Sequence, residues 1–513
     1  METEYIIVQA GGRGTRLGQL THNKPKALLP VQNVPLLFHL FKHFPSKKFI
    51  VIGDYKFDVL QRYLKAFADV DCMLVNAHGG TGTCAGLAEA VALVPNGKPF
   101  MIVWCDLLLP NDFALPAEDG NFLGVSRNFP CRWKYEDGIF CEQSSENHGV
   151  AGLFIFSNSS LLQDVPHDGE FVRWLSGKDI SFKELVLSGT REFGLLDEYK
   201  KLGVEKCRPF NKMTVTQDRI IKEGIDEQGQ KLAVREKAWY AEVKKKGFGN
   251  IPQIFSLNPL LMERIHGMNV YELAVTEKVS VEKVSIETGL FERKKLILQR
   301  IVNCLQSLQR LGSIPSDRAS FDAAYITKTE DRLMKVQDLV PFAHDEYVTV
   351  NGRKCRNVFF HWQELKDAVS SYFPLEFKFI HGDCTFSNIM LKEGDVPILI
   401  DPRGYFGTTE LFGDAAYDWA KLYYSIVGNY DQFNLKRFSL DIREHDVMLD
   451  IESNHWEDME KTFFNLLKDE VDERQIKIIH AIIWLSLTTY AWQDYDSVCG
   501  AFYNGLYYLE EVL

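Results

Sequence analysis

Two polar, glycine-containing motifs, each placed directly after an apolar run, most constrain how this chain of 513 residues can fold. Ala10–Arg16 (AGGRGTR) follows Tyr5–Gln9 near the start, and His381–Asp383 (HGD) follows Phe377–Ile380 far downstream. Such a pattern is typical of a buried strand whose loop lets backbone amides approach a phosphate group. Because the chain is too long for one ordinary core, we expect two phosphate-handling loops in different domains.

The composition fits a globular protein and excludes several classes of partner. Apolar residues make up 46% and charged residues 25% of the chain, and the net charge is −12 with a pI near 5.6. Nucleic acids and anionic membranes attract basic surfaces, so neither is expected as a partner. The ten cysteines form no Cys-x-x-Cys pair, and free thiols in a reducing cytoplasm are the simplest interpretation.

Membrane insertion is not expected either. Met1–Glu4 lacks the basic and apolar regions of a signal peptide. The most apolar late segment, Ile476–Trp492, contains Lys477 and His480 and is too short and too polar to span a bilayer. A buried helix and a cytoplasmic location are the predictions for this protein.

The first part of the chain alternates between strand and helix patterns. Apolar runs at Tyr5–Gln9, Lys48–Gly53 and Phe100–Asp106 predict strands, and Leu36–Phe44 and Asp58–Ala68 predict helices between them. This alternation indicates an α/β domain built on a largely parallel sheet, with ligands at the carboxyl ends of the strands.

The pattern changes after the polar stretch Tyr199–Gly203. A β-rich segment follows, with strands at Lys212–Thr216 and Arg219–Lys222, then a helix at Leu232–Lys246, and long helical periodicity from Glu292 onward. A small β-rich lobe followed by a large helical lobe suits a kinase. The expected domains are residues 1–203, a small lobe at 204–265 and a helical lobe at 266–513.

The first loop has the composition of a triphosphate site. Its glycines would place consecutive amides against phosphate oxygens, while Arg16 and Lys26 would neutralise the charge that develops as pyrophosphate leaves. A plain turn is the alternative for a glycine-rich loop alone. The additional segment Asn23–Val31 (NKPKALLPV) favours the phosphate-binding interpretation.

With these motifs, the N-terminal part resembles the sugar-phosphate nucleotidyltransferase family, which implies a Rossmann-like fold. The resemblance implies that Arg16 contacts phosphate and that Lys26 contacts the α-phosphate. Gly79–Thr83 resembles the base-recognition loop of that family. The nucleotide-binding residues implied in this way are Ala10, Gly11, Gly12, Gly14, Thr15, Gly82 and Thr83.

The same resemblance implies a Mg²⁺ site. Asp106 ends an apolar run as the family's metal-binding aspartate does, although a helix cap is the alternative. Glu192 occupies the position of the second metal ligand, where the family usually has aspartate, and Asp197 is the other candidate.

The second motif has the spacing of a kinase catalytic loop. Asp383 would accept the proton of a substrate hydroxyl, and Asn388 in the same loop would bind Mg²⁺. Asp401 ends the next apolar run, Ile398–Ile400, and would be the second metal-binding acid. A buried structural pair of Asp and Asn is the alternative.

Residues 207–513 resemble the aminoglycoside phosphotransferase and choline kinase superfamily, whose loop reads His-Gly-Asp or His-Asn-Asp. The resemblance implies an α+β bilobal, protein-kinase-like domain. Lys222 is placed like the lysine that binds ATP phosphates, and Glu236 like its ion-pair partner, although both could be ordinary surface charges. Leu260–Ile265 resembles the hinge strand that holds adenine through its backbone, which implicates Met262 and Glu263.

Two features near this loop concern the acceptor. Arg403 could orient an acceptor or its new phosphate, or it could fix the loop through Asp414 or Asp418. The aromatic run Tyr417–Tyr424 could wall an acceptor site, as aromatic residues do for choline, but helical spacing favours core packing for most of it.

Together the motifs predict a bifunctional enzyme that uses ATP and Mg²⁺ to phosphorylate a sugar, alditol or amino alcohol. The small-molecule phosphate would then attack a second NTP, with CTP or UTP expected, to give an activated donor for surface-glycan synthesis and pyrophosphate. Synthesis of CDP-choline and a regulatory protein with one degenerate domain are the alternatives. The acceptor, the nucleobase and the oligomeric state stay open.

Overall fold

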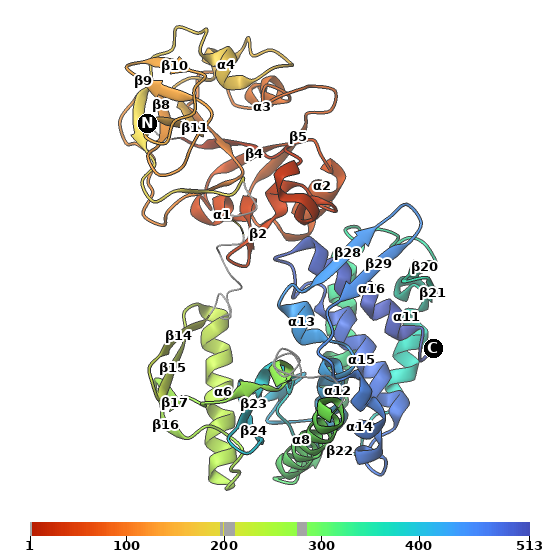
Figure 1. The fold of residues 1–513 in the computed structure, drawn as a ribbon. Helices are drawn as coiled ribbons and strands as arrows, with labels where there is room; N and C mark the ends of the chain where they lie inside the picture. The colour runs from red at the N-terminus through yellow and green to blue at the C-terminus, as the bar shows by residue number, and fades with distance from the viewer. Residues whose placement is uncertain (1–2, 195–198, 200–210, 274–284) are drawn as a thin grey trace. The chain divides into compact units, whose positions relative to one another are not determined.

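The computed structural model describes residues 3–194, 199, 211–273 and 285–513. The chain divides into two compact units (Figure 1). Unit 1 comprises Met1–Glu205 with Trp492–Asp496, and unit 2 comprises Lys206–Ala491 with Ser497–Leu513. The stretch that the sequence suggests as a boundary, Tyr199–Gly203, falls almost entirely outside the described residues.

Unit 1 is built on a mixed sheet whose centre is parallel. β1 (Tyr5–Gln9) pairs in parallel with β4 (Lys48–Gly53) on one side and with β6 (Phe100–Trp104) on the other. β5 (Cys72–Asn76) extends the parallel part beyond β4, and β11 (Gly149–Phe156) joins antiparallel to β6. The strands expected from the apolar runs are therefore confirmed, and they form the parallel sheet that the alternation predicts.

The helices α1 (Leu36–His43) and α2 (Phe57–Phe67) follow the predicted segments to within one residue at each end. Other elements of unit 1 are α3 (Leu87–Ala92), α4 (Phe171–Leu175), η1 (Thr15–Thr21), η2 (Lys26–Leu28), η3 (Ser159–Leu162), β2 (Pro30–Val31), β3 (Val34–Pro35), β7 (Leu107–Leu108), β8 (Phe122–Ser126), β9 (Lys134–Glu136), β10 (Ile139–Cys141), β12 (Lys183–Val186) and β13 (Arg191–Glu192).

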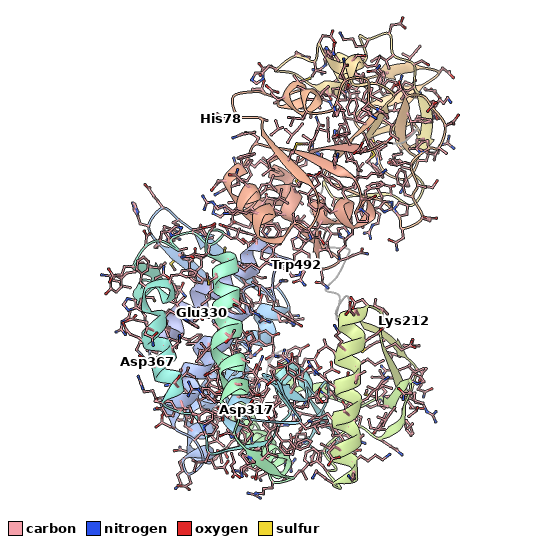
Figure 2. The ribbon with its side chains drawn as sticks, turned by 180° about the vertical axis from the view of Figure 1, so that it is seen from behind. His78, Lys212, Asp317, Glu330, Asp367 and Trp492 are labelled. Carbon is pink, nitrogen blue, oxygen red and sulfur yellow. The ribbon has the colours of Figure 1, made fainter. Side chains whose placement is uncertain are left out.

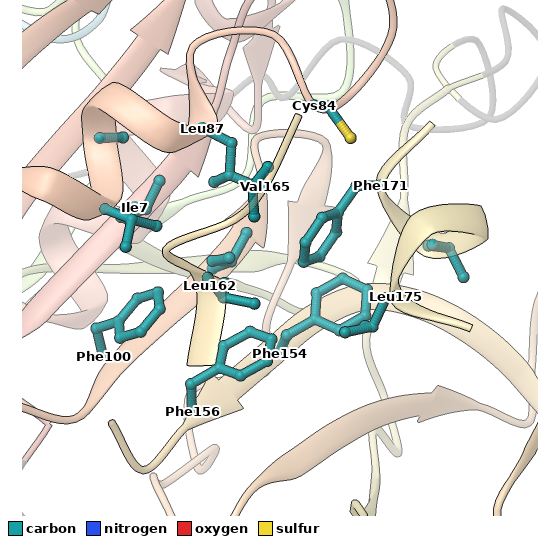
Figure 3. Close-up of a cluster of buried hydrophobic side chains, with 14 of the residues drawn as sticks. Ile7, Cys84, Leu87, Phe100, Phe154, Phe156, Leu162, Val165, Phe171 and Leu175 are labelled. Carbon is teal, nitrogen blue, oxygen red and sulfur yellow. The ribbon is translucent and has the colours of Figure 1, made fainter. Parts of the chain in front are cut away.

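An apolar core fills one face of this sheet (Figure 3). Phe100 from β6 stacks on Phe156 from β11 with ring centroids 5.3 Å apart, and Phe154 meets Phe171 of α4 edge to face. All four rings are fully buried, and aromatic burial of this kind supplies a large share of the hydrophobic free energy of a domain. The core thus fixes β1 and β6, the strands from which the first candidate site extends.

Unit 2 begins with a small antiparallel sheet. Its strand order is β14 (Asn211–Val215), β15 (Arg219–Gly224), β17 (Leu260–Glu263) and β16 (Ile254–Leu257). α6 (Glu227–Lys245) packs against β15 and starts earlier than expected. The reason is local, because the Asp226 side chain accepts a hydrogen bond from the Gly229 amide and caps the helix.

The rest of unit 2 is mainly helical, as the periodicity after Glu292 predicts. Asp317, labelled in Figure 2, caps the start of α9, because its side chain accepts hydrogen bonds from the amides of Ala319 and Ser320. The helices are α8 (Ser285–Gln309), α9 (Arg318–Asp322), α10 (Lys328–Val336), α11 (Val358–Ser370), α12 (Ala415–Ile426), α13 (Tyr430–Asn434), α14 (Glu460–Leu467), α15 (Glu473–Leu487) and α16 (Tyr495–Leu509).

Short strands join these helices and carry the second motif. β22 (Glu376–Phe379) leads into the His381–Asp383 loop, and the hairpin of β23 (Ile389–Lys392) and β24 (Val396–Leu399) follows it. The remaining strands are β18 (Met268–Asn269), β19 (Ser313–Pro315), β20 (Tyr347–Val350), β21 (Arg353–Arg356), β25 (Tyr405–Phe406), β26 (Thr409–Glu410), β27 (Phe412–Gly413), β28 (Phe438–Ile442) and β29 (Val447–Ile451).

The apolar segment Ile476–Trp492 lies mostly in α15, whose residues from Ile478 to Ser486 are buried. This confirms the prediction of a buried helix. Among the described residues, no helix combines the length and the apolar character needed to cross a membrane.

Candidate functional sites

The loop after β1 is anchored at both ends. The Ala10 amide donates to the Ile52 carbonyl of β4 at 2.8 Å, so the loop leaves the sheet at the carboxyl ends of two parallel strands. Gly14 has a left-handed backbone (φ 66°), and a Cβ there would come within 3.3 Å of Lys26 Cβ. Glycine therefore allows the loop to pack directly on the Lys26 segment.

The outer side of this loop borders a cavity of about 470 Å³. Arg13 lies over the Tyr55 ring, with its Cζ 5.3 Å from the ring centroid, and Arg16 is exposed nearby in sequence. The residues that line the cavity are Arg13, Thr15, Gly18, Gln19, Thr21, His22 and Tyr55. Glycine-loop amides and two arginines at strand ends suit a polyphosphate.

Lys26, Asp106 and Glu192 come together at the inner side of the loop. Lys26 Nζ contacts Asp106 Oδ2 and lies 3.9 Å from Glu192 Oε1. The two acids meet because β7, directly after Asp106, pairs with β13, which ends at Glu192. The predicted lysine and metal acids are thus neighbours, although they are distant in sequence, whereas Asp197 lies outside the described residues.

The electrostatics of this cluster suit a bound cation. Burial, and then the nearby Asp106 carboxylate, raise the pKa of Glu192 to about 7. Burial alone would lower the pKa of Lys26, but Asp106 and the other acidic neighbours, Glu192 among them, together outweigh it and the pKa is raised. Asp106 Oδ1 is buried and has no hydrogen-bond partner among the described residues.

These observations fit a Mg²⁺ ion held by Asp106 and Glu192. A divalent cation would satisfy the orphaned Asp106 oxygen and relieve the repulsion between the two carboxylates. The described residues contain no group of three His, Cys, Asp or Glu side chains placed to hold a metal. The other ligands would therefore come from substrate phosphates and water, as is usual for Mg²⁺.

The second glycine stretch is firmly packed. A Cβ on Gly82, whose φ is 76°, would lie 2.3 Å from the Gly169 carbonyl oxygen, so a side chain has no room there. Thr83 Oγ1 accepts a hydrogen bond from the Phe171 amide at the start of α4. The hydroxyl therefore joins this loop to α4, and a contact of Thr83 with a nucleobase stays a prediction.

Comparison with known proteins finds a match in the N-terminal part of the chain. Residues 6–115 match the model of the MobA-like NTP transferase domain. The N-terminal part of the chain contains an NTP transferase domain. It has the Rossmann-like nucleotidyltransferase fold that the sequence predicts.

The relatives of the NTP transferase domain have names that describe nucleotide transfer to sugar phosphates. A glucose-1-phosphate thymidylyltransferase of Streptomyces griseus is 31% identical over 124 residues, which are 23% of this chain and 31% of that protein. A probable mannose-1-phosphate guanylyltransferase of Oryza sativa subsp. japonica is 28% identical over 21% of this chain and 32% of its own length. The chain spans about a third of the length of these curated relatives.

Solved structures are similar at lower identity. The CTP:phosphocholine cytidylyltransferase from Streptococcus pneumoniae matches with 21% identity and a TM-score of 0.33, over 39% of this chain and 98% of that structure. The inositol-1-phosphate CTP transferase from T. maritima matches with 15% identity and a TM-score of 0.33, over 39% and 95%.

In unit 2, Asp418 of α12 fixes the His381–Asp383 loop. Its buried carboxylate accepts hydrogen bonds from the amides of His381 at 2.8 Å and Gly382 at 2.7 Å. Burial raises the pKa of Asp418 to about 6, and these two amides oppose the shift. Gly382 has a left-handed backbone (φ 81°), which this tight turn requires.

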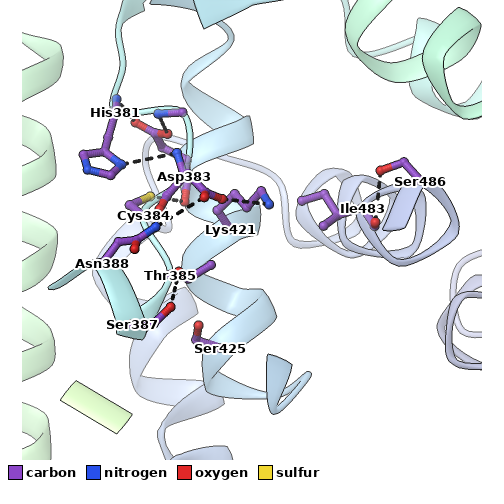
Figure 4. A network of polar contacts seen from close by, with 12 residues as sticks. His381, Asp383, Cys384, Thr385, Ser387, Asn388, Lys421, Ser425, Ile483 and Ser486 are labelled. Atoms are coloured by element: carbon purple, nitrogen blue, oxygen red, sulfur yellow. Dashed lines mark hydrogen bonds and ion pairs between the residues drawn. The ribbon is translucent and has the colours of Figure 1, made fainter. Parts of the chain in front are cut away.

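Asp383 lies at the centre of the polar network in Figure 4. Its Oδ1 is 3.0 Å from Lys421 Nζ, and the Asn388 side-chain amide donates to its carbonyl at 2.7 Å and to Oδ2 at 3.3 Å. His381 donates from Nε2 to the Ile400 carbonyl and accepts the Asp383 amide at Nδ1. Burial lowers the pKa of His381 to about 4, so the ring is neutral and serves as a structural link.

Lys222, Glu236 and Asp401 form a second polar group of unit 2. Lys222 Nζ lies 2.9 Å from Glu236 Oε2 and 2.8 Å from Asp401 Oδ1. The side chains of Lys222 and Glu236 are 10% and 7% exposed, so the alternative that they are surface charges is wrong. Burial raises the pKa of Glu236 to about 7, while the Lys222 ammonium opposes this shift.

The residues offered for a Mg²⁺ ion here also have suitable chemistry. The Asn388 amide nitrogen donates to Asp383, so a cation would take the amide oxygen, the atom that Mg²⁺ prefers. The Asp401 side chain is 49% exposed and so accessible to an ion and to nucleotide phosphates. Asp401 has a left-handed backbone (φ 53°), which is strained for a residue other than glycine and sits at a candidate functional position.

Met262 and Glu263, where the resemblance implies an adenine contact, lie in the middle of a sheet. Both residues lie inside β17, which pairs with β15 on one side and with β16 on the other. The Glu263 amide already donates to the Gln253 carbonyl at 2.9 Å, and its carboxylate accepts from Lys392. This backbone donor is therefore used within the sheet, because the strand is central and not at an edge.

The acceptor region contains residues that the sequence did not single out. The aromatic run in α12 is buried, including Tyr417, Trp419 and Tyr424, which confirms core packing for most of it. Asp414 accepts a hydrogen bond from the Tyr325 hydroxyl, and Asp418 accepts hydrogen bonds from loop amides, so neither acid is the partner of Arg403. Lys421 was not anticipated as the partner of Asp383, although its spacing from Asp418 places the two on one helix face.

Proposed function

We propose that the NTP transferase domain joins the phosphate of a small molecule to a nucleotide. A phosphate oxygen of the substrate attacks the α-phosphorus of an NTP, the bond from that phosphorus to the bridging oxygen breaks, and pyrophosphate leaves. The approach of Lys26 to Asp106 and Glu192 carries this proposal. The relatives that transfer nucleotides to sugar 1-phosphates support it.

The residues of this domain have separate roles in that proposal. Lys26 neutralises the charge that develops on the α-phosphate, and Arg16 with the loop amides after Ala10 holds the phosphates that leave. Asp106 and Glu192 would hold Mg²⁺, which supplies Lewis-acid activation when bound. Gly82 lets the loop before α3 pack closely against Gly169, and this loop would face the nucleobase.

We infer that unit 2 supplies this phosphate as an ATP-dependent kinase of an alcohol. The hydroxyl oxygen of the acceptor attacks the γ-phosphorus of ATP, its proton passes to Asp383, and ADP leaves. The observation that carries the inference is the Asp383–Asn388 contact beside the group formed by Lys222, Glu236 and Asp401. In such a site, Lys222 holds ATP phosphates and Glu236 positions Lys222.

The two reactions fit one sequence of chemistry. The product of the proposed kinase, a small-molecule phosphate, is the nucleophile of the proposed transferase. The final product would be an NDP-linked sugar, alditol or amino alcohol, with CTP or UTP as the expected second nucleotide.

Separate assays test each half with the full chain. Pyrophosphate release is measured for each of the four common NTPs against a panel of sugar, alditol and amino-alcohol phosphates. ADP formation is measured with the corresponding alcohols, and we expect both reactions to require Mg²⁺. Pyrophosphate release without any alcohol-dependent ADP formation would contradict the kinase assignment alone, and the opposite result would contradict the transferase assignment alone.

A further inference from the structure

Four basic side chains of unit 2 form a cluster beside Asp383. Lys421 of α12 pairs with Asp383, while Lys328 of α10 and Arg403 of the loop after β24 interact with it electrostatically. Arg332 of α10 is the fourth member, because it lies near Lys328 and Arg403. Lys328 and Lys421 both approach Tyr417, with their Nζ atoms 5.7 and 5.9 Å from its ring centroid. The Tyr417 ring therefore has two ammonium groups within about 6 Å, one from α10 and one from α12, near the predicted catalytic loop.

Arg403 and Arg332 extend the same cluster. The Arg403 amide donates to the His381 carbonyl at 2.9 Å, and its Cβ would lie 3.1 Å from a Cβ built on Gly382. The loop that contains Asp383 and the backbone of Arg403 are thus in direct contact. The Arg332 guanidinium donates to the Ser486 carbonyl of α15, which is a neutral partner.

The cluster contains more positive than negative charge. Asp383 pairs with Lys421, and the nearby acids Asp414 and Asp418 accept hydrogen bonds from Tyr325 and from loop amides. Within the part of the chain that the structure describes, no carboxylate lies within ion-pair distance of the other three cations, Lys328, Arg332 and Arg403.

Such an arrangement costs free energy in the absence of a ligand. Burial, and then the charges of Arg403, Arg332 and Lys421, lower the pKa of Lys328 well below its usual value. Desolvated like charges that lack a carboxylate partner repel one another, and an anion placed among them would offset that cost. The cluster is therefore suited to an anionic ligand and unsuited to a cation.

The position of the cluster indicates which ligand this is. In the proposed reaction the acceptor hydroxyl must lie at Asp383, whose neighbours are these cations. The phosphates of ATP have their own partner in Lys222, which lies on β15 and forms a different group with Glu236 and Asp401. The excess positive charge thus lies beside the acceptor hydroxyl.

We propose that the alcohol phosphorylated by unit 2 carries an anionic group of its own, a carboxylate or a phosphate, which Lys328, Arg332 and Arg403 bind. The proposal rests on the proposed kinase function and makes its substrate class more specific. It disfavours choline, because a quaternary ammonium group would be repelled by the same side chains that attract an anion. Charge-assisted hydrogen bonds from arginine are well suited to either anion.

The test is a calorimetric titration of the full chain saturated with Mg²⁺ and AMP-PNP, a nonhydrolysable analogue of ATP. Inorganic phosphate and malonate are the probes for the two anion classes, and choline is the third probe. We expect at least one anion to bind while choline does not. Arg332→Gln and Lys328→Gln should each weaken that binding by at least about 10-fold, the scale of one lost charge-assisted hydrogen bond.

Lys461→Gln is the matched control, because Lys461 is an exposed residue of α14 and the change removes the same charge. This variant should bind the anion as tightly as wild type does. Any anion that binds to the NTP transferase domain should also bind equally to all variants, because all of them share that domain. Cooperative thermal unfolding of the two cluster variants, at or above the wild-type temperature, would show that they are folded. A second variant pair, Lys328→Arg and Arg332→Lys, keeps the charge and should keep most of the affinity.

The outcomes separate the two proposals. Binding of choline, or anion binding that Arg332→Gln and Lys328→Gln leave unchanged, would overturn the anionic acceptor. Anion binding only in the absence of AMP-PNP would also overturn it, since the cations would then serve the phosphates of ATP. If AMP-PNP itself does not bind, or binds equally to Lys222→Ala, the kinase function fails first, and the acceptor assignment fails with it.

Discussion

The two candidate sites differ in the sign of their excess charge, which is negative in unit 1 and positive in unit 2. In unit 1 two carboxylates, Asp106 and Glu192, share one lysine, and the pKa of Glu192 is raised to about 7. In unit 2 one carboxylate, Asp383, pairs with Lys421, and three more basic side chains lie in the same cluster. The first site therefore calls for a divalent cation beside the substrate, and the second calls for an anion on the substrate itself.

This contrast shows that a protein can stabilise the negative charge of phosphate groups in two ways. Where acids dominate, a bound metal ion must reverse the local charge before a triphosphate can approach. Where lysine and arginine dominate, the protein stabilises the phosphate charge directly, and the acceptor can carry a negative group. Mutations of single charges should affect the two activities independently.

The largest effect is expected from Lys26→Ala. A lysine aimed at charge that develops in a water-poor site is worth roughly 100- to 1,000-fold in rate. Pyrophosphate release should fall by that factor, while ADP formation by unit 2 stays normal. The matched control is Lys48→Ala, because Lys48 is half exposed and pairs with Glu4. Normal pyrophosphate release by Lys26→Ala would remove the basis of the first site.

Asp383→Ala should have the opposite specificity. Loss of the proton acceptor should reduce alcohol-dependent ADP formation at least roughly 100-fold. Transfer of a nucleotide to a supplied small-molecule phosphate should be unaffected in the same preparation, which also serves as the control for folding. Near-normal ADP formation would show that Asp383 is a structural acid and not a catalytic base.

Glu236→Gln should have a smaller effect, because it acts through Lys222. The loss of one charged hydrogen bond is expected to raise the KM for ATP by about 10-fold, with a smaller change in kcat. Glu242→Gln is a control on the same helix, since Glu242 pairs with Lys246 near the end of α6. Equal effects of the two variants would contradict a specific role for the Lys222–Glu236 pair.

The smallest effect concerns stability and pH. The pKa of Glu192 is raised in the folded state, so the folded protein binds the extra proton and wild-type stability falls as pH rises from about 4.5 to 7. Relative to wild type in EDTA, Glu192→Gln should gain about 1–3 kcal/mol between pH 5 and pH 8. Chemical unfolding at the two pH values measures this difference.

Mg²⁺ provides the control for that experiment. Added Mg²⁺ should stabilise wild type more at pH 8 than at pH 5, because protonated Glu192 is a poor ligand. If added Mg²⁺ stabilised wild type and Glu192→Gln equally at both pH values, the carboxylate pair would not be a metal site.

Much of this account follows from local sequence patterns. The apolar runs gave β1, β4 and β6 correctly, since each run is buried in a parallel sheet. The spacing from Asp383 to Asn388 placed both in one loop, where they are hydrogen-bonded. Short-range signals of this kind depend on backbone geometry, which the sequence specifies within a few residues.

The remaining features depend on packing between distant segments. Asp418 and Lys421 share a face of α12, but no local signal shows that α12 runs beside the loop of His381. The same holds for Lys328 and Arg332 of α10, which look like ordinary surface charges in the sequence. The resemblance of Leu260–Ile265 to a hinge strand implies an adenine contact at Glu263, whereas the pairing of β17 on both sides is a property of the whole sheet.

The central claim is that the phosphate made by unit 2 becomes the nucleophile of the NTP transferase domain. The most direct test is one incubation of the full chain with ATP labelled in its γ-phosphate, Mg²⁺, a second NTP and a panel of unphosphorylated alcohols that includes hydroxy acids, sugar phosphates and choline. The account predicts that the label appears in the nucleotide-linked product, and that Lys26→Ala stops it at the small-molecule phosphate. A labelled phosphate that is never joined to a nucleotide by the wild-type protein would contradict the claim.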